Sequence, residues 1–139
     1  MLHHVSFGVA DLRRSAGFYD AVLSALGYVR VWADDTAVGY GLPGGDDGLA
    51  LKLRENARPP GPGFHLAFAA LSREAVIAFH AAALRHGGQD DGAPGPRPHY
   101  GPDYYAAFVV DPDGVHIEAV VHGAEPSAAR VDDDLADSA

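Results

Sequence analysis

The chain has 139 residues, of which 47% are apolar, and a formal net charge of −9. This length suits one domain with a hydrophobic core. The acidic charge argues against a nucleic-acid groove, which needs a basic stripe, and no run of about 18 apolar residues indicates a membrane span. Because the chain has no cysteine, any metal would have to be held by His and carboxylate groups. We therefore expect a cytoplasmic protein without nucleic-acid or membrane partners.

The chain repeats itself at an offset of 61 residues. Each copy combines a short apolar strand, a polar residue that can cap a helix, about four helical turns and a glycine that can end the helix. The matched pairs are His4 and His65, Phe7 and Phe68, Asp11 and Ser72, Phe18 and Phe79, Leu23 and Leu84, and Gly27 and Gly88. A histidine at the same strand position in both copies predicts two half-sites that face each other across a pseudo-two-fold axis.

The first copy predicts a βαβββ unit. Residues 4–9 alternate between a face that carries His4 with small residues and an apolar face, as in a strand that covers a helix. Asp11 is expected to cap a helix that ends at Gly27, and strands are expected at 28–34, 37–42 and 49–53. The Pro- and Gly-rich residues 54–63 then link the two copies.

The second copy begins with a strand at 64–69 and a helix that Ser72 caps and Gly87–Gly88 ends. Residues 89–103 are rich in Gly, Pro, His and Tyr, which predicts a long loop such as a lid or a binding loop. Strands at 104–110 and 115–121 flank a tight turn, and the acidic residues 123–139 are predicted to form a disordered tail.

These elements predict one α+β domain over residues 1–122, made of two tandem βαβββ modules whose curved mixed sheets enclose a cavity. Module one spans residues 1–53, the linker 54–63 and module two 64–122. Sheet edges need cover, and two-fold dimers are the commonest assembly. We therefore expect a homodimer that binds a small molecule.

Four positions related by the repeat are candidates for a site. Aligning the last strands of the two copies at an offset of 66 residues matches Lys52 with Glu118 and places both on the inner face, together with His4 and His65. Two imidazoles and one carboxylate can form a facial set that leaves open positions on Fe(II), Mn(II) or a similar ion. The alternative is a metal-free polar cavity floor held by a Lys52–Glu118 ion pair.

Three segments resemble the vicinal oxygen chelate superfamily, which includes glyoxalase I, extradiol dioxygenases, fosfomycin-resistance thiol transferases and bleomycin-resistance proteins. They are HHVSFGVADLRRSAGFYDAVLSALGY, GFHLAF and FVVDPDGVHIEAV, and the resemblance covers residues 2–122. It implies a glyoxalase-like fold, with His4, His65 and Glu118 as ligands of a divalent Fe, Mn, Ni or Zn ion. Members build the site either within one chain or between two, and the sequence leaves this choice open.

Lys52 departs from the superfamily pattern. Glyoxalase I has an acidic ligand at the matching position, and a protonated ammonium group cannot bind a metal. This disfavours glyoxalase I activity but retains the His, His and Glu set of the dioxygenases and thiol transferases. Beside a metal, Lys52 would have a lowered pKa and could serve with Glu118 as a catalytic proton-handling group. Alternatively, it pairs with Glu118.

The candidate substrate contacts are aromatic. They are His99, Tyr100, Tyr104 and Tyr105, with His116 on the strand of Glu118. The alternatives are a loop that packs its own rings over the sheet and a partly solvated His116. Two functions follow: a divalent-metal-dependent lyase, isomerase or dioxygenase that acts on a small oxygenated organic molecule, or a metal-free sequestering protein of the bleomycin-resistance type.

Overall fold

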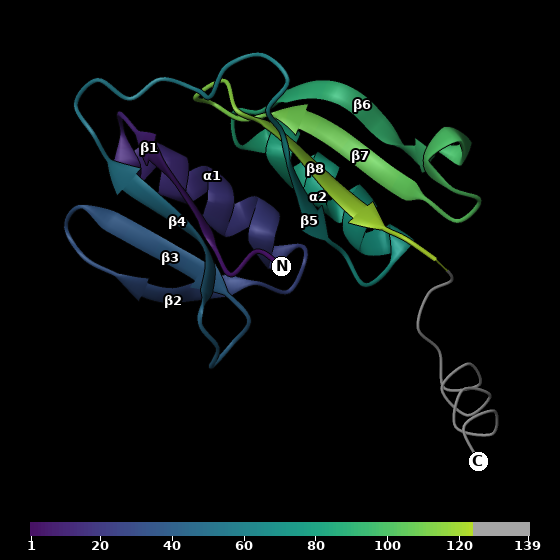
Figure 1. Cartoon of the computed structure of the whole chain (residues 1–139), viewed down its shortest axis with the longest axis horizontal. Helices are drawn as coiled ribbons and strands as arrows, with labels where there is room; N and C mark the ends of the chain where they lie inside the picture. Colours follow the sequence, from purple (N-terminus) through teal and green to yellow (C-terminus); the bar gives the residue numbers. More distant parts are fainter. Residues whose placement is uncertain (124–139) are drawn as a thin grey trace.

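The computed structural model describes residues 1–123 and contains two four-stranded mixed sheets, each with its own helix (Figure 1). Module one contains β1 (Val5–Val9), α1 (Leu12–Ser24), β2 (Val29–Ala33), β3 (Ala37–Gly41) and β4 (Asp47–Leu53), with strand order β1-β4-β3-β2. Module two contains β5 (Leu66–Ala69), α2 (Arg73–Arg85), β6 (Gln89–Pro96), the 3₁₀ turn η1 (Pro98–Tyr100), β7 (Tyr105–Val110) and β8 (His116–Val121), with order β5-β8-β7-β6. The predicted α+β fold of two βαβββ modules is confirmed.

The two helices confirm the repeat, because α2 begins and ends 61 residues after α1. The Asp11 carboxylate accepts a hydrogen bond from the Arg14 amide at 3.1 Å, and the Ser72 hydroxyl accepts one from the Ala75 amide at 3.1 Å. Each cap satisfies a backbone donor of the first helical turn that has no partner within the helix. Buried side chains recur at helical spacing along both elements, among them Phe18, Tyr19, Val22, Val76, Phe79 and Ala83.

The helix ends depart from the repeat by one residue. Gly27 adopts a positive φ of 89° after α1, whereas after α2 the positive φ of 97° belongs to Gly87. Gly88 has a different role, because a Cβ there would lie 2.9 Å from the Cε2 atom of Phe18. Its missing side chain allows α1 of module one to pack closely against the end of α2.

The prediction of a long loop over residues 89–103 is wrong in its first half, where β6 forms an edge strand. β6 pairs with β7 alone and has register shifts around Gly92 and Gly95. Proline lacks an amide donor but is tolerated at an irregular edge strand. Because proline is also typical of loops, the composition of these residues predicted a loop instead of a strand. The Arg97 guanidinium donates to the carbonyls of Ala93 and Gly95 at 2.8 and 2.9 Å, which satisfies acceptors at these irregularities.

The two modules meet through their helices. α1 and α2 pack against each other, and the buried side chains of both modules form one continuous core. Each sheet therefore has one face covered by its helix, and the opposite face is turned away from the shared core. Within residues 1–123 no helix is long and apolar enough to cross a membrane.

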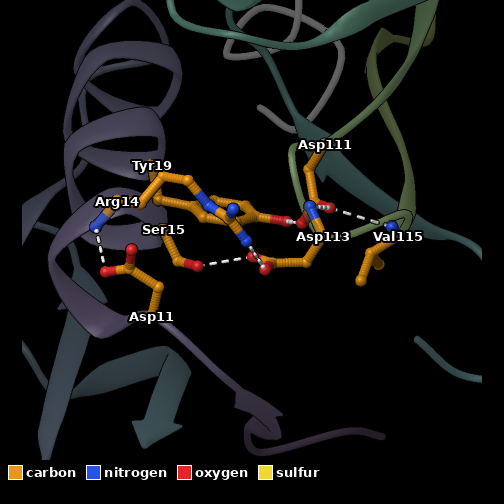
Figure 2. A network of polar contacts seen from close by, with 7 residues as sticks. All are labelled: Asp11, Arg14, Ser15, Tyr19, Asp111, Asp113 and Val115. Atoms are coloured by element: carbon orange, nitrogen blue, oxygen red, sulfur yellow. Dashed lines mark hydrogen bonds and ion pairs between the residues drawn. The ribbon is translucent and has the colours of Figure 1, made fainter. Parts of the chain in front are cut away.

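A partly buried polar network ties module two to α1 (Figure 2). The Tyr19 hydroxyl donates to Asp111 at 2.6 Å, while Arg14 and Ser15 donate to Asp113. Asp111 also accepts hydrogen bonds from the amides of Asp113 and Val115, both at 2.8 Å, and so shapes the turn between β7 and β8. Burial is the main cause that raises the pKa of both Tyr19 and Asp111. This network fixes the turn that leads into β8, which begins two residues before Glu118.

We predict that Tyr19→Phe lowers the free energy of unfolding by about 1–3 kcal/mol, because the buried Asp111 carboxylate loses a donor that water cannot replace. Urea denaturation followed by circular dichroism measures the change. The control is Tyr100→Phe, which removes a hydroxyl from a side chain that is 58% exposed. A loss in Tyr19→Phe no larger than in the control would contradict the role of this network.

Candidate functional site

The outward face of the module-two sheet carries Glu118. Along β8, Ile117, Ala119 and Val121 belong to the core, so the intervening side chains point to the opposite face. Glu118 is paired in register with Ala67 of β5 and with Phe108 of β7, which places all three on this outward face. Glu118 is nevertheless only 2% exposed, so its carboxylate needs hydrogen-bond partners from neighbouring side chains in place of water.

Both carboxylate oxygens of Glu118 have a partner. The Nε2 atom of His65 lies 3.1 Å from Oε1, and the Tyr104 hydroxyl donates to Oε2 at 2.5 Å. His65 immediately precedes β5, and Tyr104 immediately precedes β7, so three neighbouring strands position the three groups. Burial, followed by the hydrogen bond to Glu118, raises the pKa of Tyr104 to about 12. The phenol is therefore protonated and able to donate at neutral pH.

These side chains lie in a cavity of about 480 Å³. This volume is within the range of about 300–1,000 Å³ that is typical of small-molecule sites. Module two and the last linker residue supply the entire lining, which consists of Gly63, Phe64, His65, Asp91, Tyr100, Tyr104, Phe108, His116, Ile117 and Glu118. The two modules share a smaller cavity of about 220 Å³, but it contains none of the candidate metal ligands.

His4 and Lys52 do not reach this cavity. His4 is exposed at the start of β1, where its ring contacts that of His3. Lys52 lies on β4, and no ion pair joins it to Glu118 in the part of the chain that the structure describes. Across residues 1–123 no three His, Asp or Glu side chains come together as metal ligands. One chain thus brings together two of the three predicted ligands, His65 and Glu118.

The predicted alignment of Lys52 with Glu118 is wrong by two residues. In module one Ser6 is paired with Ala50, and in module two the equivalent Ala67 is paired with Glu118. The offset between the last strands is therefore 68, and Ala50 occupies the place that Glu118 has in module two. A slip of two residues keeps every side chain on the same face, so the apolar alternation could not detect it. Neither Ala50 nor Lys52 supplies a second acidic ligand.

A sequence profile of the glyoxalase/bleomycin resistance protein/dioxygenase superfamily matches residues 1–119. The chain belongs to this superfamily. A glyoxalase/bleomycin resistance protein from Albidiferax ferrireducens T118 is 37% identical, with a TM-score of 0.74 over 86% of this chain and 97% of that protein. A glyoxalase-related enzyme from Fulvimarina pelagi is 25% identical, with a TM-score of 0.67 over 91% of this chain and 95% of that one. No curated protein matches the chain.

A glyoxalase I from Zea mays, in its V278E form, is also similar to the chain. It is 26% identical, with a TM-score of 0.64 over 84% of this chain and 44% of the maize protein. The chain therefore corresponds to less than half of the maize enzyme. The superfamily resemblance predicted from the three sequence segments is confirmed, together with the glyoxalase-like fold.

The geometry of His65 and Glu118 suits the metal that the superfamily implies. Two ligand atoms bound at right angles to one ion, each at about 2.1 Å, lie about 3.0 Å apart. The Nε2 and Oε1 atoms are separated by 3.1 Å, and imidazole and carboxylate are the donors that divalent transition metals accept. These two side chains fit as a partial ligand set, and a third ligand would have to come from elsewhere.

Of the predicted substrate contacts, Tyr100, Tyr104 and His116 line the cavity, whereas His99 and Tyr105 do not. His99 packs on Tyr100 with ring centroids 4.1 Å apart. Tyr105 is paired with Val121 of β8 and so lies on the helix side, where its ring is 4.8 Å from the Arg73 guanidinium. His116 contacts Asp91 at 3.0 Å near the cavity mouth.

Asp91 and Phe108 are cavity residues that sequence analysis missed. Phe108 could have been found by counting from the Asp111–Gly114 turn, because that hairpin places Phe108 opposite Glu118. Asp91 could not, because its position depends on the irregular edge strand β6.

We predict that the Tyr104 phenol titrates near pH 12 in the metal-free protein, about two units above an unperturbed tyrosine. The pKa is raised, so the hydrogen bond to Glu118 persists below pH 10 and is lost as the pH rises through about 12. The measurement is the tyrosinate absorbance at 295 nm, taken as the difference between the wild type and Tyr104→Phe. Glu118→Gln should bring this titration back toward pH 10, and a wild-type titration near pH 10 would contradict the contact.

Proposed function

We propose that the chain is a divalent-metal-dependent enzyme that acts on a small oxygenated organic molecule, with chemistry of the lyase, isomerase or dioxygenase type. The observation that carries this proposal is the His65–Glu118 pair on the floor of the module-two cavity. A carboxylate that is 2% exposed is costly to bury, and an imidazole 3.1 Å away at the edge of a cavity is an arrangement typical of functional sites. The superfamily includes metalloenzymes, which supports the same assignment.

We further propose that His4 of the partner subunit completes the site in a homodimer. The repeat gives His4 the same place before β1 that His65 has before β5. Strands β1 and β5 are sheet edges, and edges of this kind need a covering partner. Placing module one of one chain against module two of another covers both outward faces and brings the two histidines together. A two-fold dimer would then contain two equivalent sites.

In this arrangement each group has a defined task. A bound ion would polarise adjacent substrate oxygens and stabilise negative charge that develops on them. Glu118 would hold the ion through Oε1 and would be the carboxylate closest to the substrate. The rings of Phe108 and Tyr100 would enclose the apolar part of the substrate and exclude water. His116, oriented by Asp91, would contact its polar end at the cavity mouth, and Lys52 of the partner subunit stays a candidate for proton transfer.

The metal assignment predicts about one equivalent of a transition metal per chain in protein purified without chelator or affinity-tag nickel. His65→Ala should lower this to below about 0.2 equivalents, because two ligands cannot retain the ion. Elemental analysis gives the content, and His86→Ala at the end of α2 is the control. A wild type with less than about 0.2 equivalents, unchanged by His65→Ala, would overturn the proposal and favour the metal-free sequestering protein.

The two-chain site predicts complementation between variants. His4→Ala and His65→Ala should each lose the metal alone. After the two are mixed and subunits exchange, half of the dimers carry both variants, and each has one intact site made from His4 of one chain and His65 of the other. About a quarter of wild-type metal content should return. A site built within one chain would give no recovery, because every chain in the mixture would lack one ligand.

A further inference from the structure

We propose that Tyr104 is a positioning residue that holds Glu118 so that Oε1 faces the metal position shared with His65. The inference rests on the proposed function, because it assigns a role to Oε2 of Glu118, the oxygen of the same carboxylate that does not face His65. Tyr104 was expected from the sequence to contact a substrate. The structure instead directs its hydroxyl to Oε2 of Glu118 at 2.5 Å.

The contact controls which oxygen is available. An O–H···O⁻ hydrogen bond of about 2.5–2.7 Å is charge-assisted and roughly twice as strong as a neutral one. With Oε2 engaged by the phenol, only Oε1 remains directed toward His65. Without the phenol, Oε2 would be a buried acceptor without a partner, and the carboxylate would gain by rotating away from the ligand geometry.

Tyr104 is itself held by ring contacts and by backbone hydrogen bonds. Its ring packs between those of Tyr100 and His122, with centroid distances of 5.2 and 5.5 Å. Its carbonyl accepts from the Arg97 amide at 2.8 Å, and its amide donates to the Gly101 carbonyl at 3.3 Å. Gly101 has a φ of 154°, and a Cβ there would lie 3.2 Å from the Nε2 atom of His122. A hydroxyl presented from such a constrained segment can fix its acceptor.

The test measures the affinity of the dimeric protein for Co²⁺ by competition with a coloured chelator. Tyr104→Phe keeps the ring packing and removes one oxygen, and we expect it to weaken Co²⁺ binding by about tenfold or more, as is typical when a group that orients a ligand is removed. The matched control is Tyr105→Phe, the next residue, whose ring lies on the helix side of the sheet. Its affinity should stay within about twofold of the wild type. An equal affinity in Tyr104→Phe would overturn the inference.

A double-mutant cycle distinguishes a positioning role of Tyr104 from a general loss of structure in the Tyr104→Phe variant. In a Glu118→Asp background, which keeps a carboxylate ligand but shortens it by one methylene away from the phenol, Tyr104→Phe should weaken Co²⁺ binding no further, because the hydroxyl acts only through its contact with the Glu118 carboxylate. A further loss in that background would overturn the inference, and thermal unfolding of each metal-free variant checks that it is folded. If the wild type takes up no Co²⁺, the proposed function fails and this inference with it. If the wild type binds Co²⁺ and Tyr104→Phe binds it equally, only the role of Tyr104 fails.

Discussion

Each sheet of this protein has a single helix, and the two helices pack against each other. This constraint determines where the site can lie. The helix side of both sheets is used for one shared core, so the residues left for function are those on the outward faces. Alternation along β8 then separates Ile117 and Ala119, which stabilise the fold, from Glu118, which does not contribute to the core. The cavity beside Glu118 follows from this separation.

The carboxylate of Glu118 shows how the outward face tolerates a charge that is almost fully buried. Water reaches it poorly, so its stability there depends on His65 and Tyr104, one for each oxygen. The turn at Asp111 sets the start of β8, and Tyr19 of α1 holds that turn from the other module. The position of Glu118 is therefore fixed by contacts on both sides of its strand. As the ligand pair that we propose, His65 and Glu118 would need little rearrangement to accept an ion.

The sequence predicted the repeat and both helix caps, because these depend on local periodicity and on residue type, and it placed His65 and Glu118 on one face, where they lie 3.1 Å apart. It did not predict β6, since Pro and Gly at an irregular edge strand have the same composition as a loop. The alignment of Lys52 with Glu118 was wrong by two residues. A shift of two residues leaves the alternation of apolar and polar side chains unchanged, so that pattern cannot detect it. The sequence named both Tyr104 and Tyr105 as substrate contacts, and the hairpin register of β7 separates them, because it places even-numbered residues beside Glu118 and Tyr105 on the helix side.

The corrected register also shows that the two halves of the duplication have diverged. Where module two has Glu118 paired with Phe108, module one has Ala50 paired with Gly39, and the Trp32 ring lies directly over Gly39. The first outward face thus carries His4 and Lys52 beside small residues and the Trp32 ring, while the second carries His65, His116 and Glu118 around a cavity. Of the candidate ligands, His4 therefore lies on the first face and both His65 and Glu118 lie on the second, so the divergence leaves the acidic candidate ligand in module two alone.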